Sequence, residues 1–94
     1  MWCRTIEEAI EKGNKTIYGL GAGIVTKDID IANRLARSLR VGVVWINCYL
    51  AGGMDCPIGG CKMSGIGREY GSYGLQNYLQ VKCVITSLQE SPWL

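Results

Sequence analysis

Five cysteines are the first side chains in this sequence that could do chemistry, and they lie at positions 3, 48, 56, 61 and 83. A nucleophilic thiol needs a lowered pKa, which a histidine, a helix N-terminus or a nearby cation provides. The chain has no histidine, and only Cys61 has an obvious cation beside it, at Lys62. Cys48 and Cys83 adjoin apolar runs, where packing is the simpler interpretation. Because a zinc site needs about four N or S ligands in close pairs, we predict no metal site and no catalytic residue here.

Two glycine-rich stretches, at residues 19–23 and 59–64, could be taken for phosphate-binding loops. A dinucleotide loop needs G-x-G-x-x-G after a strand and at the start of a helix, whereas residues 19–23 have another spacing and precede an apolar run. Residues 59–64 lack the G-x-x-x-x-G-K-[ST] spacing, and Gly65 and Gly67 follow where a helix would begin. We therefore predict no cofactor-binding residue. A phosphate-binding domain built on residues 59–67 is kept as the weakest alternative.

Carboxylates are the remaining candidates for acid–base chemistry. Glu7 and Glu8 fall on a predicted helix surface, where solvation is the ordinary interpretation. Asp55 and Glu69 lie in a glycine-rich stretch and are better placed, but no base or nucleophile accompanies them. The residues by themselves show no complete catalytic arrangement.

Composition narrows the possible partners of the chain. Its 94 residues are 48% hydrophobic and only 19% charged, below the usual ~25% of soluble domains, which predicts that some apolar surface faces another part of a protein. The net charge of +2 is spread without a basic stripe, so we expect no nucleic-acid partner. No apolar run approaches ~18 residues and no apolar signal stretch begins the chain, so we expect no membrane span, a cytoplasmic location and free thiols.

Two helices are predicted in the first half of the chain. Thr5 and Glu8 have the spacing of a capping box, and Gly13 and Asn14 are expected to end the helix that follows. Asp28 is expected to cap a second helix, which carries an apolar residue every four positions. Gly42 is expected to end it.

The rest of the chain predicts strands joined by a long loop. A short strand is expected at residues 24–26, and an apolar strand covered on both faces at residues 43–46. After a glycine-rich connection over residues 49–71, Ser72 is expected to cap a short helix. Alternation predicts a last strand at residues 81–88. This order of elements indicates an α/β fold and a piece of a larger sheet.

The string P-I-G-G-C-K-M-S-G-I-G-R-E at residues 57–69, with V-W-I-N-C-Y at residues 44–49, closely resembles the aldehyde dehydrogenase superfamily. The resemblance extends over nearly the whole chain. The ending S-P-W-L, with Asp55, Cys56 and Pro57, looks most like plant cytosolic members. The resemblance implies an α/β fold in which residues 1–79 form the C-terminal portion of the catalytic domain. Residues 80–94 would form the oligomerisation strand and tail.

The family oxidises aldehydes to carboxylic acids with NAD or NADP, through a cysteine nucleophile, a glutamate that activates water and an asparagine that holds the oxyanion. By resemblance, these residues and the dinucleotide-binding domain lie upstream of this chain. None of its cysteines matches the nucleophile's motif, and Asn47 matches a loop residue. The resemblance therefore implies a fragment that is inactive alone and binds no cofactor alone.

The same resemblance assigns residues to the parent enzyme. Its substrate-binding residues would be Tyr49, Leu50, Gly52 and Ile58. Its structural residues would be Gly59, Gly60, Lys62, Gly65 and Arg68. The family commonly has aromatic residues at the positions of Gly52, Ile58 and Cys61, and this chain has no phenylalanine. Their loss would widen the aldehyde tunnel.

Two functions follow from the resemblance. The favoured one is an enzyme fragment whose parent takes an aldehyde and NAD or NADP and forms a homo-oligomer. The alternative is an interaction module that pairs with intact aldehyde dehydrogenase subunits by strand addition through residues 81–88. A cytoplasmic parent is expected, with a mitochondrial one left open.

Overall fold

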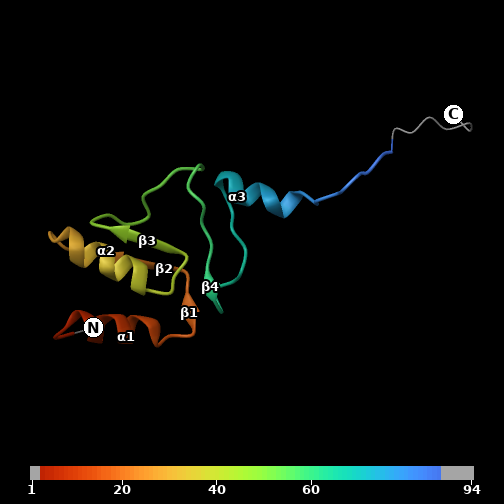
Figure 1. The fold of residues 1–94 in the computed structure, drawn as a ribbon. Coiled ribbons are helices and arrows are strands. Elements are labelled where there is room, and N and C mark those ends of the chain that lie inside the picture. The colour runs from red at the N-terminus through yellow and green to blue at the C-terminus, as the bar shows by residue number, and fades with distance from the viewer. Residues whose placement is uncertain (1–2, 88–94) are drawn as a thin grey trace, which may run out of the picture.

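The computed structural model describes residues 3–87, which form a mixed arrangement of helices and short strands (Figure 1). The predicted α/β fold class is confirmed. The elements, in chain order, are α1 (Ile6–Asn14), β1 (Tyr18–Gly19), β2 (Gly21–Ile24), α2 (Ile29–Ser38), β3 (Val43–Ile46), β4 (Cys61–Lys62), α3 (Gly71–Leu75) and the 3-10 helix η1 (Gln76–Tyr78). None of the helices in the described range is long and apolar enough to cross a membrane.

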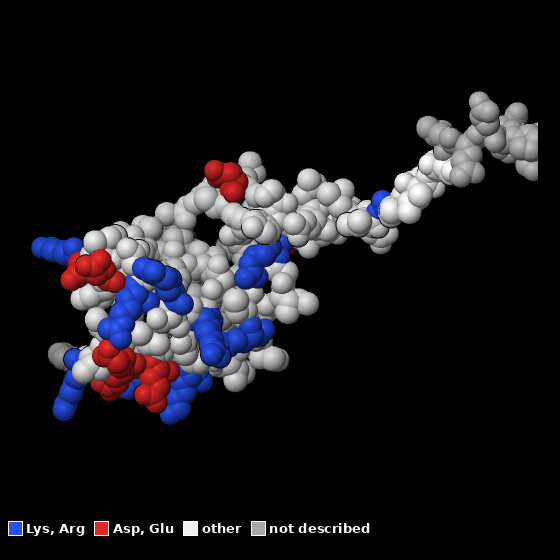
Figure 2. Space-filling model, viewed as in Figure 1, with Lys and Arg blue, Asp and Glu red and all other residues white. Residues whose placement is uncertain are grey.

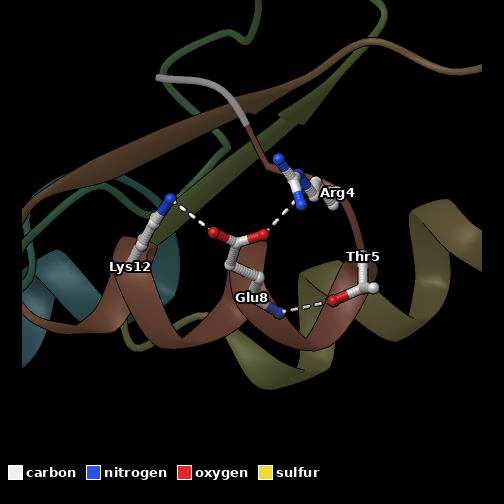
Figure 3. A network of polar contacts seen from close by, with 4 residues as sticks. All are labelled: Arg4, Thr5, Glu8 and Lys12. Carbon is white, nitrogen blue, oxygen red and sulfur yellow. Dashed lines mark hydrogen bonds and ion pairs between the residues drawn. The ribbon is translucent and has the colours of Figure 1, made fainter.

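Helix α1 begins with the predicted capping interaction, which Figure 3 shows. The backbone N–H of Glu8 donates to Thr5 Oγ1 at 3.1 Å, and the backbone N–H of Arg4 donates to Glu8 Oε2 at 2.8 Å. Lys12 Nζ lies 2.6 Å from Glu8 Oε1. One carboxylate thus satisfies a free donor at the helix start and pairs with a cation one turn later.

These contacts predict that α1 loses stability in acid. The backbone N–H of Arg4, then the ammonium of Lys12, hold the pKa of Glu8 below its ordinary value of 4.5. A backbone hydrogen bond at Glu7, then the guanidinium of Arg34, lower the pKa of Glu7 likewise. Because folding lowers both pKa values, the stability they contribute is present above the ordinary value and is lost as pH falls through the folded values.

Circular dichroism at 222 nm during an acid titration measures this loss. Glu8→Gln should reduce the helical signal at neutral pH and flatten its acid dependence. Glu11→Gln is the matched control, because it removes the same charge from α1 at a residue with no ion pair in the described structure. Equal effects of the two substitutions would show that general charge, and not the cap, controls the titration.

Helix α2 begins as predicted and ends earlier than predicted. Asp28 Oδ1 accepts hydrogen bonds from two backbone N–H groups of the first turn, at 2.9 and 3.1 Å, which confirms the cap. The helix ends at Ser38 and not at Gly42, because Leu39 is already extended at φ −79° and ψ 128°. Asn14 Nδ2 donates to Ser38 O at 2.8 Å. A tertiary contact therefore takes the carbonyl that a further helical turn would use.

The strands form two pairs. β2 and β3 are parallel, with Gly21 opposite Val43 and Ile24 opposite Ile46, which confirms the strand predicted at residues 43–46. β1 and β4 are antiparallel. The strand predicted at residues 24–26 lies instead at Gly21–Ile24, where a Cβ on Gly21 would lie 2.7 Å from Cζ3 of Trp45.

The second half departs from prediction at three places, the first of which is β4, a short strand inside the connection predicted at residues 49–71. α3 begins at Gly71 after Tyr70, and not after a cap at Ser72. Residues 79–87 contain no strand, so the strand predicted at 81–88 is not formed in this chain; Leu88 lies outside the described residues. In Figure 1 this segment runs away from the body. A strand needs a hydrogen-bonded neighbour, and the described chain places none beside it.

Little of the described chain forms a core. Ile24 and Ala32 are the two buried hydrophobic residues within residues 3–87. An open hollow of about 720 Å³ lies between α1, α2 and β2. The apolar surface that the composition predicted is thus present, and it is uncovered in this chain.

Candidate substrate-binding site

A cavity of about 210 Å³ lies between β3 and the loop that follows it. The residues that line it include Trp45, Leu50, Gly52, Cys56, Ile58 and Tyr70. Three of the four predicted substrate-binding residues are therefore brought together. The fourth, Tyr49, is not among the lining residues and lies edge-on to Trp45, with ring centroids 5.2 Å apart and an interplanar angle of 62°.

The loop turns sharply around this cavity. Leu50 adopts φ 53° and Gly52 adopts φ 141°; glycine accepts a positive φ without strain, whereas leucine does not. Trp45 Nε1 donates to Ala51 O at 2.9 Å and ties the turn to β3. Trp45 and Tyr70 could not be predicted as site residues, because a tryptophan within an apolar strand gives no sign that its N–H faces a loop.

The far wall of the cavity comes from the returning part of the chain. Ile58 and Glu69 exchange two backbone hydrogen bonds, at 2.8 and 2.7 Å, and form an isolated antiparallel bridge. The N–H of Gly71 donates to Met54 O at 2.9 Å. The long connection predicted at residues 49–71 is therefore folded back on itself, so that both of its ends border the cavity.

Arg68 closes the glycine turn between the two sides of this bridge. Its Nη1 donates to Gly60 O at 2.7 Å and to Gly67 O at 2.9 Å. A Cβ on Gly59 would lie 2.1 Å from Gly67 O, and one on Gly60 would lie 2.5 Å from Ser64 O. The turn is close-packed backbone held by one guanidinium, and side chains at either glycine would force it open.

Lys62 joins this turn to the first half of the chain. Its Nζ donates to Asn14 O and to Thr16 O, each at 3.1 Å, and Ser64 Oγ accepts from the N–H of Gly19 at 2.9 Å. The lysine and serine of the supposed phosphate loop are thus occupied by backbone groups. Because the cations that a phosphate would need are already bound, this geometry gives the phosphate-binding alternative no support.

Cys56 and Tyr70 are the titratable residues among those that line the cavity. All five cysteines are free, and Cys61 Sγ lies 3.7 Å from Arg68 Nη2. Within residues 3–87 no three His, Cys, Asp or Glu side chains are grouped so that they could hold a metal ion. Of the two carboxylates singled out from the sequence, Asp55 accepts a long contact from Cys56 Sγ at 3.8 Å, and Glu69 is joined to Ile58 through its backbone. The cavity is lined mainly by apolar groups, which can hold a ligand by van der Waals contact.

These elements define an α/β structure with a folded glycine-rich loop and an apolar cavity. Known proteins make the class specific: a family model described as the aldehyde dehydrogenase family matches residues 1–84. The chain belongs to the aldehyde dehydrogenase family.

Three relatives illustrate the similarity. The chain is 60% identical over 91 residues to aldehyde dehydrogenase 1 of Tanacetum cinerariifolium, which spans 97% of this chain and 18% of that protein. It is 50% identical to a mitochondrial benzaldehyde dehydrogenase of Antirrhinum majus, over 97% of this chain and 17% of that one. An NAD+ complex of an aldehyde dehydrogenase from Bacillus cereus matches with a TM-score of 0.86 and 46% identity, over 90% of this chain and 17% of that one.

The chain covers only a small share of the length of each relative. The chain spans about one sixth of each of these proteins, so what it has in common with them is one part of the aldehyde dehydrogenase fold.

Proposed function

We propose that this chain is the C-terminal segment of an NAD(P)-dependent aldehyde dehydrogenase and forms one wall of its aldehyde-binding site. The observation that carries the proposal is the 210 Å³ cavity, which gathers Leu50, Gly52 and Ile58 beside Trp45. Residues 1–79 would belong to the catalytic domain and residues 80–94 would pair with another subunit of a homo-oligomer. Membership of the family and the identity to named aldehyde dehydrogenases support this reading.

The wall binds and orients, and it supplies no reacting group. Leu50 and Ile58 present aliphatic carbon to the apolar part of an aldehyde, where each buried methylene contributes about 0.8 kcal/mol. Gly52 places no side chain on the wall, which leaves room for a bulkier substrate. Gly59, Gly60, Lys62, Gly65 and Arg68 would hold the turn behind this wall.

NAD or NADP would accept hydride in the parent enzyme, and the residues of this chain do not fit it. Residues 19–23 lie in and between β1 and β2, and the next helix, α2, begins only at Ile29, so no helix N-terminus lies directly behind these glycines to receive a pyrophosphate. Lys62 is bound to carbonyl groups. We therefore assign no step with the cofactor to any residue of this chain.

A chimaera tests the proposal. The matching 91 residues of the Tanacetum cinerariifolium enzyme are replaced by this chain, and aldehyde-dependent formation of NADH is measured. We expect activity within about tenfold of the parent, a change of roughly 1.4 kcal/mol, because the chemistry lies elsewhere. We expect no turnover from the chain alone.

Two results would contradict the proposal. A folded chimaera without activity would show that this segment cannot complete the site. Turnover by the chain alone would show that it contains catalytic residues of its own.

A second candidate function is an interaction module, and one observation favours it. Val81, Val84 and Ile85 are fully or largely exposed, in a segment with no strand partner in the described structure. Figure 2 shows almost no charge along this segment, whose one charged residue within residues 79–87 is Lys82. An unpaired apolar segment of this kind fits strand addition to an intact aldehyde dehydrogenase subunit.

Co-purification separates this function from the first. The tagged chain should retain an intact family member, and Val84→Lys should abolish the retention. Gln80→Lys adds the same charge near the start of this segment, before its apolar residues, and should leave the retention unchanged. No retention by the unchanged chain would remove this candidate.

A further inference from the structure

We propose that Trp45 is a positioning residue that fixes the shape of the cavity wall by holding the loop at residues 48–52 on β3. This inference rests on the proposed function, because it concerns the same cavity. Trp45 lies within β3 opposite Gly23 and also lines the cavity. It is therefore the residue at which the sheet and the wall meet.

The indole ring is held by two contacts. A Cβ on Gly21 would lie 2.7 Å from Cζ3 of Trp45 and 3.3 Å from Cη2, so β2 has room for the ring only because residue 21 is glycine. The rings of Trp45 and Tyr49 also pack edge to face, with their centroids 5.2 Å apart. A ring held in this way has one orientation, and its N–H points in a set direction.

That N–H acts on the loop. Trp45 Nε1 donates to Ala51 O at 2.9 Å, and within residues 3–87 this is the described hydrogen bond that joins residues 48–52 to the sheet. The loop needs such a tie, because Leu50 is held at φ 53°, a conformation that a leucine rarely adopts. Leu50 is also 71% exposed and gains little from burial. The hydrogen bond thus maintains a strained turn whose two flanking residues, Leu50 and Gly52, line the cavity.

Release of the tie has a specific consequence. Without the indole N–H, Leu50 is free to leave the positive-φ conformation, and the wall it forms loses its shape. Substrate fit then suffers while the reacting groups, which this chain does not supply, stay in place. The expected signature is a raised KM for the aldehyde with kcat little changed.

The test uses Trp45→Phe in the chimaera described above, because phenylalanine keeps an aromatic ring and removes the donor. We expect the KM for a bulky aromatic aldehyde to rise about fivefold, kcat to stay within about twofold, and amide exchange to accelerate about tenfold at residues 49–53 alone. Gly21→Ala, which keeps Trp45 but displaces its ring, should give the same signature. Tyr78→Phe, at an exposed residue that is not among those lining the cavity, is the matched control.

The outcomes separate the role of Trp45 as a clamp on the loop at residues 48–52 from the proposed function of the chain. Unchanged exchange at residues 49–53 in both variants overturns the clamp, and so does exchange accelerated evenly over the whole segment. A fall in kcat equal to the loss in kcat/KM also overturns it. Inactivity of the unsubstituted chimaera counts against the proposed function, while exchange at residues 49–53 still decides the clamp.

Discussion

Gly42→Ala is expected to destabilise the chain by about 3 kcal/mol, at the upper end of what overpacking usually costs. A Cβ on Gly42 would lie 1.6 Å from the carbonyl oxygen of Gly59 and 2.7 Å from its carbonyl carbon. Both of the clashing atoms are backbone, so no side-chain rotation can relieve the contact. The N–H of Gly42 also donates to Gly19 O and Leu20 O, at 3.1 and 3.2 Å, which prevents the residue from moving away.

The substitution should also reach the cavity. Gly59 follows Ile58, so displacing its carbonyl moves the far wall and breaks the bridge between Ile58 and Glu69. Urea denaturation followed by circular dichroism measures the free energy of unfolding, and the chimaera reports the loss of activity.

Gly67→Ala is the matched control for this substitution. No atom lies within 4 Å of a Cβ placed on Gly67, and its φ is not positive. The free energy of unfolding should therefore change by about 0.5 kcal/mol or less, as for other surface substitutions. Equal stability of the two variants would mean that Gly42 and Gly59 do not lie in contact.

Asn14→Ala is expected to cost about 2 kcal/mol, because it removes two hydrogen bonds that join separate parts of the chain. Asn14 Nδ2 donates to Ser38 O, and its Oδ1 accepts from the N–H of Arg40, each at 2.8 Å. Its own carbonyl accepts from Lys62 Nζ at 3.1 Å. One residue thus fastens α1 to the end of α2 and to β4.

Two further variants sharpen this experiment. Asn14→Asp keeps the acceptor for Arg40 and loses the donor to Ser38 O, so its free energy of unfolding should lie between those of the wild type and Asn14→Ala. Asn33→Ala removes an exposed asparagine on α2 whose side chain makes none of the described hydrogen bonds, and it should be nearly neutral. A loss at Asn33 as large as the loss at Asn14 would contradict the proposed role of Asn14.

Local signals in the sequence were sufficient wherever the interaction is local. The caps at Thr5 and Asp28 were predicted from spacing alone, since each acceptor lies two or three residues from its donor. The same reasoning failed at Ser72, because the start of α3 is set by the contact of Gly71 with Met54 and not by a side-chain cap. It also failed at Gly42, since distant groups end α2 first.

The candidate site likewise contains residues that could be predicted from the sequence and residues that could not. The resemblance singled out Leu50, Gly52 and Ile58, which the fold brings together. It did not single out Trp45, whose contribution depends on Gly21, 24 positions earlier along the chain, and on Ala51. Contacts between residues far apart in sequence leave no periodic pattern, so spacing cannot reveal them.

What the sequence determined by itself about this protein is its family, its α/β class and the caps of its first two helices, because motifs and caps are short-range patterns. Only the tertiary structure decided that Lys62 binds backbone carbonyls, that Arg68 closes the glycine turn and that residues 79–87 form no strand in this chain. Each of these depends on which distant backbone group is available to pair. An alternating sequence favours a strand, but a strand forms only where a second one lies beside it.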